Sequence, residues 1–179
     1  STSKRADGST RQDVSHKVST KEDSNPTITS SGKTDNTITI KADAGTTANV
    51  TIKDTNIDST GTGKAAIKTE GKGDVNLNVE GINTATSDEG HAGVEKSNDG
   101  NLTIGSKSGS CELAANGGDR GAGIGGGQGS DGTDITIAGG KITANGGVEA
   151  AGIGGGSFGD GSSITVSGGE VTANGGNSG

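Results

Sequence analysis

A unit of 29 residues is written twice in succession in the C-terminal part of this sequence. Residues 115–143 read ANGGDRGAGIGGGQGSDGTDITIAGGKIT and residues 144–172 read ANGGVEAAGIGGGSFGDGSSITVSGGEVT, with 17 of 29 positions identical and no gap. Residues 173–176 then begin the unit again with ANGG. A fixed period between about 20 and 50 residues is typical of a solenoid, in which each unit forms one coil and buries its apolar residues against its neighbours.

Three short apolar segments recur in each unit and predict three strands per coil. They are Ile135 with Ile137, then Ile142, and the Ala-Gly-Ile segment that ends at Ile124 in one copy and Ile153 in the next. Alternation of apolar residues with threonine is typical of a half-buried strand, and Gly, Asn, Asp and Ser between the segments form turns. Because no segment has helical spacing, we predict an all-β fold, a parallel β-helix with 25–33 residues in each coil.

The same frame extends backward in degenerate form, with coils expected to start at Val50, Val75, Leu102, Ile135 and Ile164. Four extra residues in 105–110 are expected to lie in a turn. In this frame the following residues occupy equivalent inward positions: Val50, Ile52, Ile57 and Ile67; Val75, Leu77, Ile82 and Val94; Leu102, Ile104, Leu113 and Ile124.

The expected β-helix spans residues 27–179, and residues 1–26 are a polar N-terminal tail or a cap. Five of the fifteen basic residues and few apolar ones occur in this N-terminal segment, which ends at Pro26. A charged cap would cover an open sheet edge, and a disordered linker accounts for the same composition. The last unit stops after ANGG, so we expect the C-terminus to be cropped mid-repeat within a longer chain.

Polar residues that recur at 29-residue spacing should stack on neighbouring coils. Asn116, Asn145 and Asn174 have the spacing of an amide ladder, in which each side chain bonds the next. Glu112, Lys141 and Glu170 alternate in charge at the same spacing. Arg120 and Glu149 form one more pair of opposite charges 29 residues apart.

The composition is compatible with a thin interior column and excludes several classes of partner. Hydrophobic residues make up 25% of the chain, glycine accounts for 37 residues, and Phe158 is the single aromatic residue. A net charge of -7 argues against nucleic acid and against anionic membrane surfaces as partners. No apolar run is long enough to span a bilayer, so membrane insertion is not expected. Cys111 is the only cysteine, which excludes an internal disulfide and favours a structural thiol.

The AGIGGG, ITIAGGKITANGG and ITVSGGEVTANGG strings resemble the glycine-rich, right-handed β-helix repeats of exported and wall-anchored proteins of anaerobic Gram-positive bacteria. Some of these repeats are described as carbohydrate-binding modules. The close resemblance covers residues 115–176 and a looser one reaches back to about residue 50. It implies a right-handed coil, an extracellular or cell wall-associated location, and an adhesive, structural or glycan-binding role.

Two clusters of polar residues are candidates for metal binding. Residues 126–134 read GGQGSDGTD, close to a calcium-binding nonapeptide, and Asp-Gly recurs before three strands at Asp99, Asp131 and Asp160. Solvated Asp-Gly turns explain the same pattern without an ion, so calcium is an open option rather than an expected cofactor. Asp88, Glu89 and His91 share one loop and could be part of a metal site, although a solvated loop has the same composition.

Catalysis is not expected from this sequence. Arg120 is the only arginine in the repeat region, and no dense group of acids falls on adjacent strands, as a polysaccharide lyase or hydrolase would need. Sugar stacking has Phe158 as its single candidate ring. A column of Thr51, Thr103, Thr136 and Thr165, interrupted by Asn76, raises ice binding as a further alternative, but one broken column is not a flat array of two columns.

The expected function is therefore a non-catalytic cell-surface β-helix module that acts as an adhesin or structural stalk. A carbohydrate-binding module, with or without calcium, is the main alternative, and a degenerate polysaccharide lyase or hydrolase is a weaker one. The expected partners are a polysaccharide or a host or cell-surface glycoprotein.

Overall fold

The computed structural model describes residues 2–4, 10–12 and 24–178, which form strands and turns with no helix among them. The first two strands, β1 (Thr2–Lys4) and β2 (Thr10–Gln12), pair antiparallel. Most of the predicted tail or cap lies outside the described residues. The coils begin at β3.

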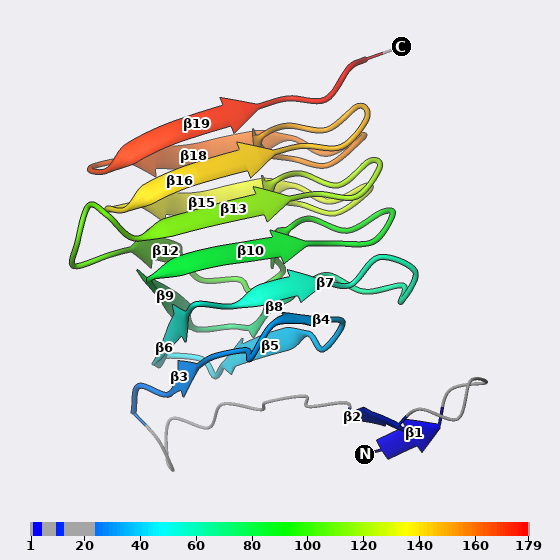
Figure 1. Ribbon diagram of the computed structural model, residues 1–179. Helices are drawn as coiled ribbons and strands as arrows, with labels where there is room; N and C mark the ends of the chain where they lie inside the picture. Colours follow the sequence, from blue (N-terminus) through cyan, green and yellow to red (C-terminus); the bar gives the residue numbers. More distant parts are fainter. Residues whose placement is uncertain (1, 5–9, 13–23, 179) are drawn as a thin grey trace.

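From β3 onward the strands follow a regular order, in which each strand pairs in parallel with the third one before and after it (Figure 1). The first sheet contains β3 (Thr27–Ile28), β6 (Thr47–Lys53), β9 (Asp74–Glu80), β12 (Leu102–Gly105), β15 (Gly132–Ile137) and β18 (Gly161–Val166). The second contains β4 (Lys33–Thr34), β7 (Asn56–Asp58), β10 (Ile82–Thr86), β13 (Glu112–Asn116), β16 (Lys141–Asn145) and β19 (Glu170–Asn174). The third contains β5 (Ile38–Ala42), β8 (Ile67–Gly71), β11 (Val94–Lys96), β14 (Ile124–Gly125) and β17 (Ile153–Gly154).

This arrangement confirms the predicted parallel β-helix with three short strands in each coil. The strands of the second sheet run from left to right across the front of Figure 1 while the chain climbs from bottom to top, so the coil is right-handed. The extra residues between β12 and β13 form the loop that protrudes at the left of the same view, as expected for an insertion that a turn absorbs.

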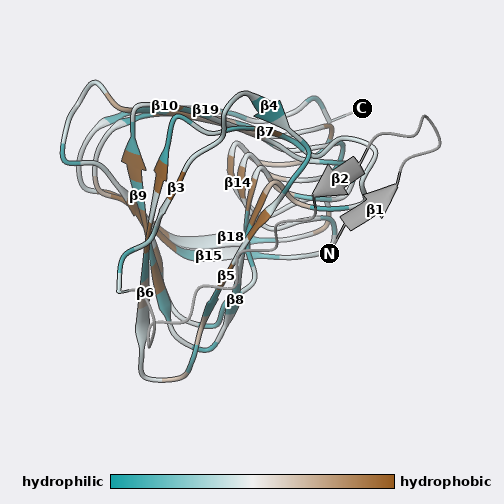
Figure 2. Ribbon diagram, turned by 60° about the horizontal axis from the view of Figure 1, so that its bottom comes forward, coloured by the Kyte–Doolittle hydropathy of each residue, from teal (hydrophilic) through white to brown (hydrophobic). Residues whose placement is uncertain are grey.

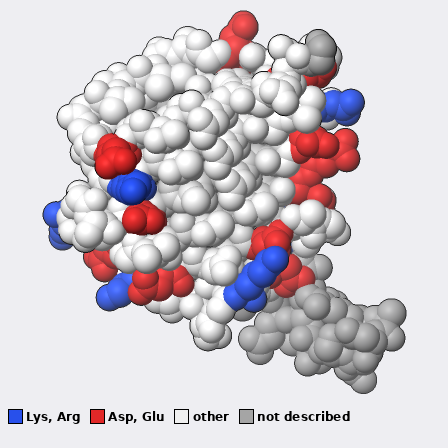
Figure 3. Space-filling view, turned by 45° about the horizontal axis from the view of Figure 1, so that its top comes forward, with Lys and Arg blue, Asp and Glu red and all other residues white. Residues whose placement is uncertain are grey.

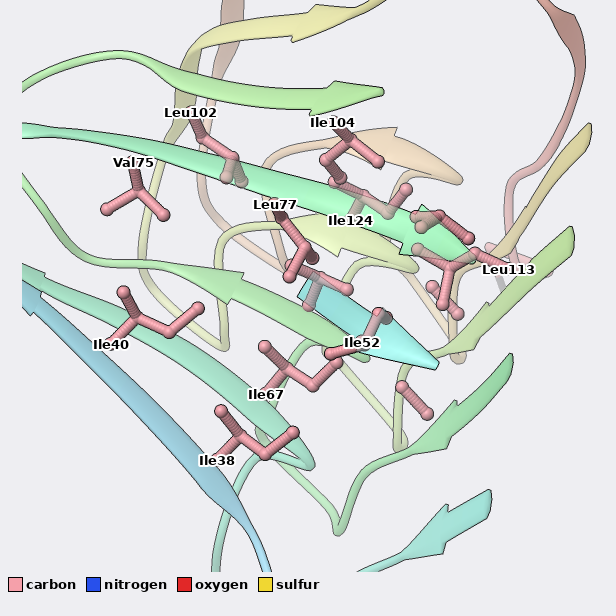
Figure 4. Packing of buried hydrophobic residues seen from close by; sticks show 14 of the residues in the cluster. Ile38, Ile40, Ile52, Ile67, Val75, Leu77, Leu102, Ile104, Leu113 and Ile124 are labelled. Atoms are coloured by element: carbon pink, nitrogen blue, oxygen red, sulfur yellow. The ribbon is translucent and has the colours of Figure 1, made fainter. Parts of the chain in front are cut away.

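Branched apolar side chains from all three sheets fill the interior as continuous columns (Figure 4). Leu77, Ile104 and Ile137 lie directly above one another in the first sheet and are fully buried. In the third sheet Ile67, Val94 and Ile124 stack in the same way, as the sequence frame predicts. Each side chain contacts its equivalents one coil below and one coil above, which allows a chain with little apolar material to bury a continuous core.

The predicted frame is wrong in the earlier coils at two points. In the second coil Val50 pairs with Leu77 rather than with Val75, whose partner is Ala48, and Ile57 pairs with Ala85 rather than with Ile82. A shift of two residues keeps every side chain on its face, so the hydropathy pattern could not distinguish the two registers.

The second error concerns Ile82, which is 66% exposed and pairs with Glu112, while Asn83 takes the inward place beneath Leu113. The turn after β9 is one residue longer than the corresponding turn after β15: Leu77 and Asn83 are six residues apart, whereas their equivalents Ile137 and Ile142 are five apart. A one-residue offset reverses the face of every following side chain in a strand. Ile82 was expected to face inward because the sequence frame assumed the same turn length in every coil.

The cross-section of the coil narrows between the third and the fourth coil. In the third sheet, β5 and β8 have five residues each, whereas β14 and β17 have two. The longer strands of the early coils meet β6 at a wedge-shaped corner that extends beyond the later coils (Figure 2). The later coils replace this corner with glycine-rich loops.

Lys96 and Asn98 close the wedge at the level where it ends. Lys96 pairs with Thr69 of the coil below, is buried, and donates from Nζ to the Asn98 carbonyl oxygen at 2.6 Å. The Asn98 amide donates to Gly73 O at 2.9 Å, and its Oδ1 accepts from Thr69 Oγ1 at 2.7 Å. These bonds satisfy polar groups that the shorter coil above could not cover with apolar side chains.

Glycine is required at the corner of the later coils because backbone stacks on backbone there. Gly125 has a φ of 135°, and a Cβ at this position would lie 2.0 Å from the carbonyl oxygen of Gly154. This close approach leaves no room for a side chain, so only glycine fits at this corner.

Candidate functional site

The aspartates predicted as weak calcium candidates lie in exposed turns. Asp131 accepts the backbone N–H of Asp160 on its Oδ1 at 2.8 Å, and the two residues occupy adjacent coils. Asp99 is exposed, and its own backbone N–H donates to Gly71 O at 2.8 Å. The Asp131 carboxylate thus joins two coils directly.

The same bond between an aspartate and the next coil occurs elsewhere in the molecule. Asp74 Oδ1 accepts the backbone N–H of Asn101 at 2.8 Å, and Asp54 Oδ1 accepts that of Ile82 at 3.0 Å. These carboxylates replace a backbone acceptor at turns where the sheet ladder stops.

The structure does not bring Asp88, Glu89 and His91 together as a metal site. Asp88 accepts the backbone N–H of Gly63 at 2.6 Å, and backbone donors at Gly61 and Gly63 lower the pKa of its carboxyl group. Glu89 Oε1 lies 3.7 Å from Arg120 Nη1, so these two residues form an ion pair. Throughout residues 24–178 no three His, Cys, Asp or Glu side chains have the arrangement of a metal-ion site.

His91 instead contacts a buried carboxylate that the sequence analysis missed. Its Nδ1 lies 2.8 Å from Oε2 of Glu95, which is only 6% exposed. Lys68 Nζ lies 3.5 Å from the other carboxylate oxygen, and the Ala92 backbone N–H donates to Oε2 at 3.3 Å. Gly127 of the next coil passes over this carboxylate, where a Cβ would come within 2.9 Å of Oε2. The 27-residue spacing of Lys68 and Glu95, which are register partners, is the sequence signal for this group.

Phe158 lies at one corner of the solenoid and is 89% exposed, in the turn between β17 and β18. The neighbouring Ser157 donates its backbone N–H to Arg120 O at 2.9 Å and its hydroxyl to Glu149 Oε2 at 3.2 Å. The expected pair between Arg120 and Glu149 is thus replaced by Arg120 with Glu89 and Glu149 with Ser157. Exposed Val148 accepts the Arg120 backbone N–H. We name Arg120, Val148, Glu149 and Phe158 the Phe158 corner.

The outer face of the second sheet carries threonine and asparagine in register. The expected amide ladder is present: Asn174 Nδ2 donates to Asn145 Oδ1 at 2.7 Å, and Asn145 Nδ2 donates to Asn116 Oδ1 at 2.8 Å. Figure 3 shows a broad surface without charged side chains beside a short column of alternating charge. We name the outward residues of β10, β13, β16 and β19 in this surface the Thr/Asn face: Thr84, Thr86, Ala114, Asn116, Thr143, Asn145, Thr172 and Asn174.

The threonine column predicted on the first sheet is partly confirmed. Thr103, Thr136 and Thr165 are register partners. Asn76 and Asn49 continue this column below Thr103, with Asn76 Nδ2 donating to Asn49 Oδ1 at 2.9 Å. Thr51 belongs to a different column, where it pairs with Asn78 and is buried. Its assignment to the threonine column was wrong because the register of this coil is shifted by two residues.

A cavity of about 660 Å³ opens at the first coil. Apolar side chains of Ile28, Ile38 and Ile57 line it together with serine, threonine and the buried, unpaired Oδ1 of Asn36. Lys33 is the one charged residue of its lining and lies 2.6 Å from Asp58 Oδ2. The lining residues of this cavity therefore offer no carboxylate or imidazole for chemistry.

Comparisons with protein-family models, with curated proteins and with solved structures found no match to this chain. The described residues contain no helix that is both long and apolar enough to cross a membrane. The chemistry of the surface is therefore the basis for assigning a function.

Proposed function

We propose that this chain is a non-catalytic β-helix module of a cell surface, extracellular or wall-associated, that acts as a rigid stalk or adhesin. The observation that carries this proposal is that charged side chains join consecutive coils along the axis. Five ion pairs each connect residues of different coils: Lys33 with Asp58, Lys53 with Glu80, Lys68 with Glu95, Arg120 with Glu89, and Lys141 with Glu170.

These contacts support a mechanical role because they act in the same direction as the interior columns. A single exposed ion pair stabilises a protein by only about 0 to 1 kcal/mol. Here the pairs add to the amide ladder, to the aspartate bonds between coils and to continuous sheets that run along the axis. Two neighbouring coils cannot separate without breaking the parallel strand pairs between them, together with whichever of these polar contacts join the two.

Hydrogen exchange followed by mass spectrometry tests the stalk. We expect the backbone amides in the strands of the second to fifth coils to exchange in one cooperative step, since each coil is stabilised by its neighbours. Lys53→Gln, which removes the ion pair with Glu80, should leave this cooperativity unchanged. Coils that open one at a time at very different rates would contradict a rigid stalk.

A calcium-assisted carbohydrate-binding module is the second candidate, and the Phe158 corner favours it. An exposed aromatic ring with nearby polar groups suits stacking against a sugar ring. The nearby turn of Asp131 would be the place for an ion that bridges protein and glycan.

Retention on insoluble plant, fungal and mucosal polysaccharides, measured with calcium and then with chelator, separates the two functions. Retention that is lost with chelator, with Asp131→Ala and with Phe158→Ala would establish the glycan module. Lys107→Ala, in the exposed loop after β12, is the control that should not change retention. No retention on any polysaccharide would leave the stalk or a protein-directed adhesin.

A further inference from the structure

The Thr/Asn face forms a two-dimensional array with fixed spacings. Register partners on neighbouring strands lie about 4.8 Å apart, and alternate residues along one strand lie about 6.6 Å apart. Thr143 and Thr172 belong to one column of this array, and Asn145 and Asn174 belong to the other. The row below has Ala114 with Asn116, and the next has Thr84 with Thr86, so the array continues over four strands with one threonine replaced.

The polar groups of this face are held in place before any ligand arrives. The asparagine column is joined from Asn174 through Asn145 to Asn116, whose Nδ2 donates to Thr86 Oγ1 at 3.1 Å. β-Branched threonine side chains have few χ1 rotamers. A ligand that binds here would therefore order few side chains, which removes one of the main costs of binding.

Charged residues stand at the margins of the face and not within it. Glu112, Lys141 and Glu170 form a column at one edge, and Lys141 Nζ lies 4.0 Å from Glu170 Oε1. At the lower end of the face, Asp58 of β7 lies beside Thr86 of β10 and forms an ion pair with Lys33. The surface between these margins presents hydroxyl, amide and methyl groups, and the residues that define it include no charged side chain.

An uncharged array with a regular spacing fits a ligand that is itself a regular, uncharged lattice of hydrogen-bonding groups. Water in the prism plane of hexagonal ice forms a rectangular lattice of similar dimensions, and threonine offers both a hydroxyl to join that lattice and a methyl group to pack against it. We infer that the Thr/Asn face is an ice-binding surface. This inference does not rest on the stalk function, and it uses a different face from the Thr103, Thr136 and Thr165 column of the first sheet.

Thermal hysteresis and the shape of single ice crystals test this inference with the purified chain. The parent protein should separate the freezing and melting temperatures and facet the growing crystal. Thr143→Tyr places a bulky ring in the centre of the face and should abolish both effects. Thr136→Tyr is the matched control, because this threonine is likewise half-buried on a strand of the same coil, in the first sheet, and it should retain both effects. Circular dichroism and thermal melting show that each variant is folded.

Three results would overturn the inference. The first is a parent protein that neither shapes ice nor shows hysteresis. The second is equal loss of activity in the two folded tyrosine variants, since ice would then not be bound by the Thr/Asn face. The third is retention on crystalline cellulose or chitin that Thr143→Tyr abolishes without any effect on ice, which would assign the face to a polysaccharide lattice.

Discussion

Asn83 Oδ1 accepts two hydrogen bonds from Thr55, one from its backbone N–H and one from its hydroxyl, both at 2.9 Å. Asn83 is 1% exposed and lies in the column that Leu113 and Ile142 occupy in the following coils. Its amide donates to the carbonyl oxygens of Glu80 and Glu112. One asparagine thus joins three coils at a position where the following coils have an apolar side chain.

Asn83→Ala should lower the free energy of unfolding by about 2 to 3 kcal/mol, because it leaves buried donors of Thr55 without an acceptor. Chemical denaturation at neutral pH measures this loss. Asn78→Ala, a half-buried asparagine on the outer face of β9, serves as the control and should change stability much less. A loss at Asn83 no larger than that at Asn78 would show that the buried network adds little.

Ile137→Asp should abolish the cooperative unfolding transition, since it places an unpaired charge in a fully buried column. Val166→Asp is the matched control, because Val166 is the register partner of Ile137 in the last coil and is 55% exposed. Thermal melting should remain cooperative in the second variant. If both variants melt like the parent, the side chain of Ile137 does not face inward.

Lys96→Met should raise the free energy of unfolding at neutral pH by roughly 1 kcal/mol, as replacing buried charges by apolar residues often does. Burial lowers the pKa of Lys96 from its ordinary value of 10.5, so the unfolded chain holds this proton more tightly than the folded one. The cost of the charge is present in full at neutral pH and is relieved as the pH rises from the folded-state pKa towards 10.5. The gain in Lys96→Met should therefore shrink in alkaline solution.

Thermal melting of the parent and of Lys96→Met across this pH range measures the effect, with Lys64→Met as an exposed control. A lower melting temperature for Lys96→Met at neutral pH would mean that Lys96 is net stabilising. Its hydrogen bond to Asn98 and its attraction to Asp134, Asp99 and Asp74 would then outweigh the cost of burial.

Asp58 should contribute stability that acid removes. Hydrogen bonds from Lys33 and Thr60 lower the pKa of its carboxyl group from 3.8 to about 2, so folding favours the ionised form. The stability that ionised Asp58 contributes is complete when the pH is above the ordinary pKa of 3.8, and it is lost as the pH falls from 3.8 to about 2. Asp58→Asn should be less stable than the parent at neutral pH, and the two melting curves should converge near the lower limit. A difference that persists unchanged in acid would assign the effect to packing.

Exchange of Lys141 and Glu170, by Lys141→Glu with Glu170→Lys, should change the free energy of unfolding by well under 1 kcal/mol, because both side chains are exposed and the pair is preserved. Lys141→Glu alone brings like charges onto neighbouring strands beside Glu112 and should cost more. Urea denaturation of the three proteins provides the comparison. A large loss in the double variant would reveal a contact other than the ion pair.

The later coils could be predicted from the sequence because their residues repeat at one fixed spacing. Asn116, Asn145 and Asn174 stack as expected, since no turn between them changes length. The earlier coils could not be aligned by the same spacing, because a single additional residue in the turn before Ile82 exchanges the inward and outward faces. Hydropathy reports the period of a strand and does not report the length of a turn.

The candidate sites depend on contacts between residues of different coils, which the order of residues along the chain does not show. Glu95 has the sequence context of an outward residue of a strand, and it becomes buried because Gly127 of the next coil crosses above it. The Thr/Asn face, in contrast, has a visible signal. Thr-Ala-Asn recurs at a spacing of 29 residues, at 143–145 and 172–174, and these threonines lie outside the predicted column of threonines flanked by isoleucine, valine or leucine.

The boundary of the sequence unit coincides with one full turn of the coil, since Ala144 lies directly above Ala115 and Ala173 directly above Ala144. An in-frame duplication of 29 codons in a gene for this chain would therefore insert a complete coil, with its share of the core, its ladder asparagine and its threonine. Each such event lengthens the molecule by about 4.8 Å without altering any existing contact within a coil. Unequal recombination can thus adjust the height of the protein and the extent of its outer faces in the same step.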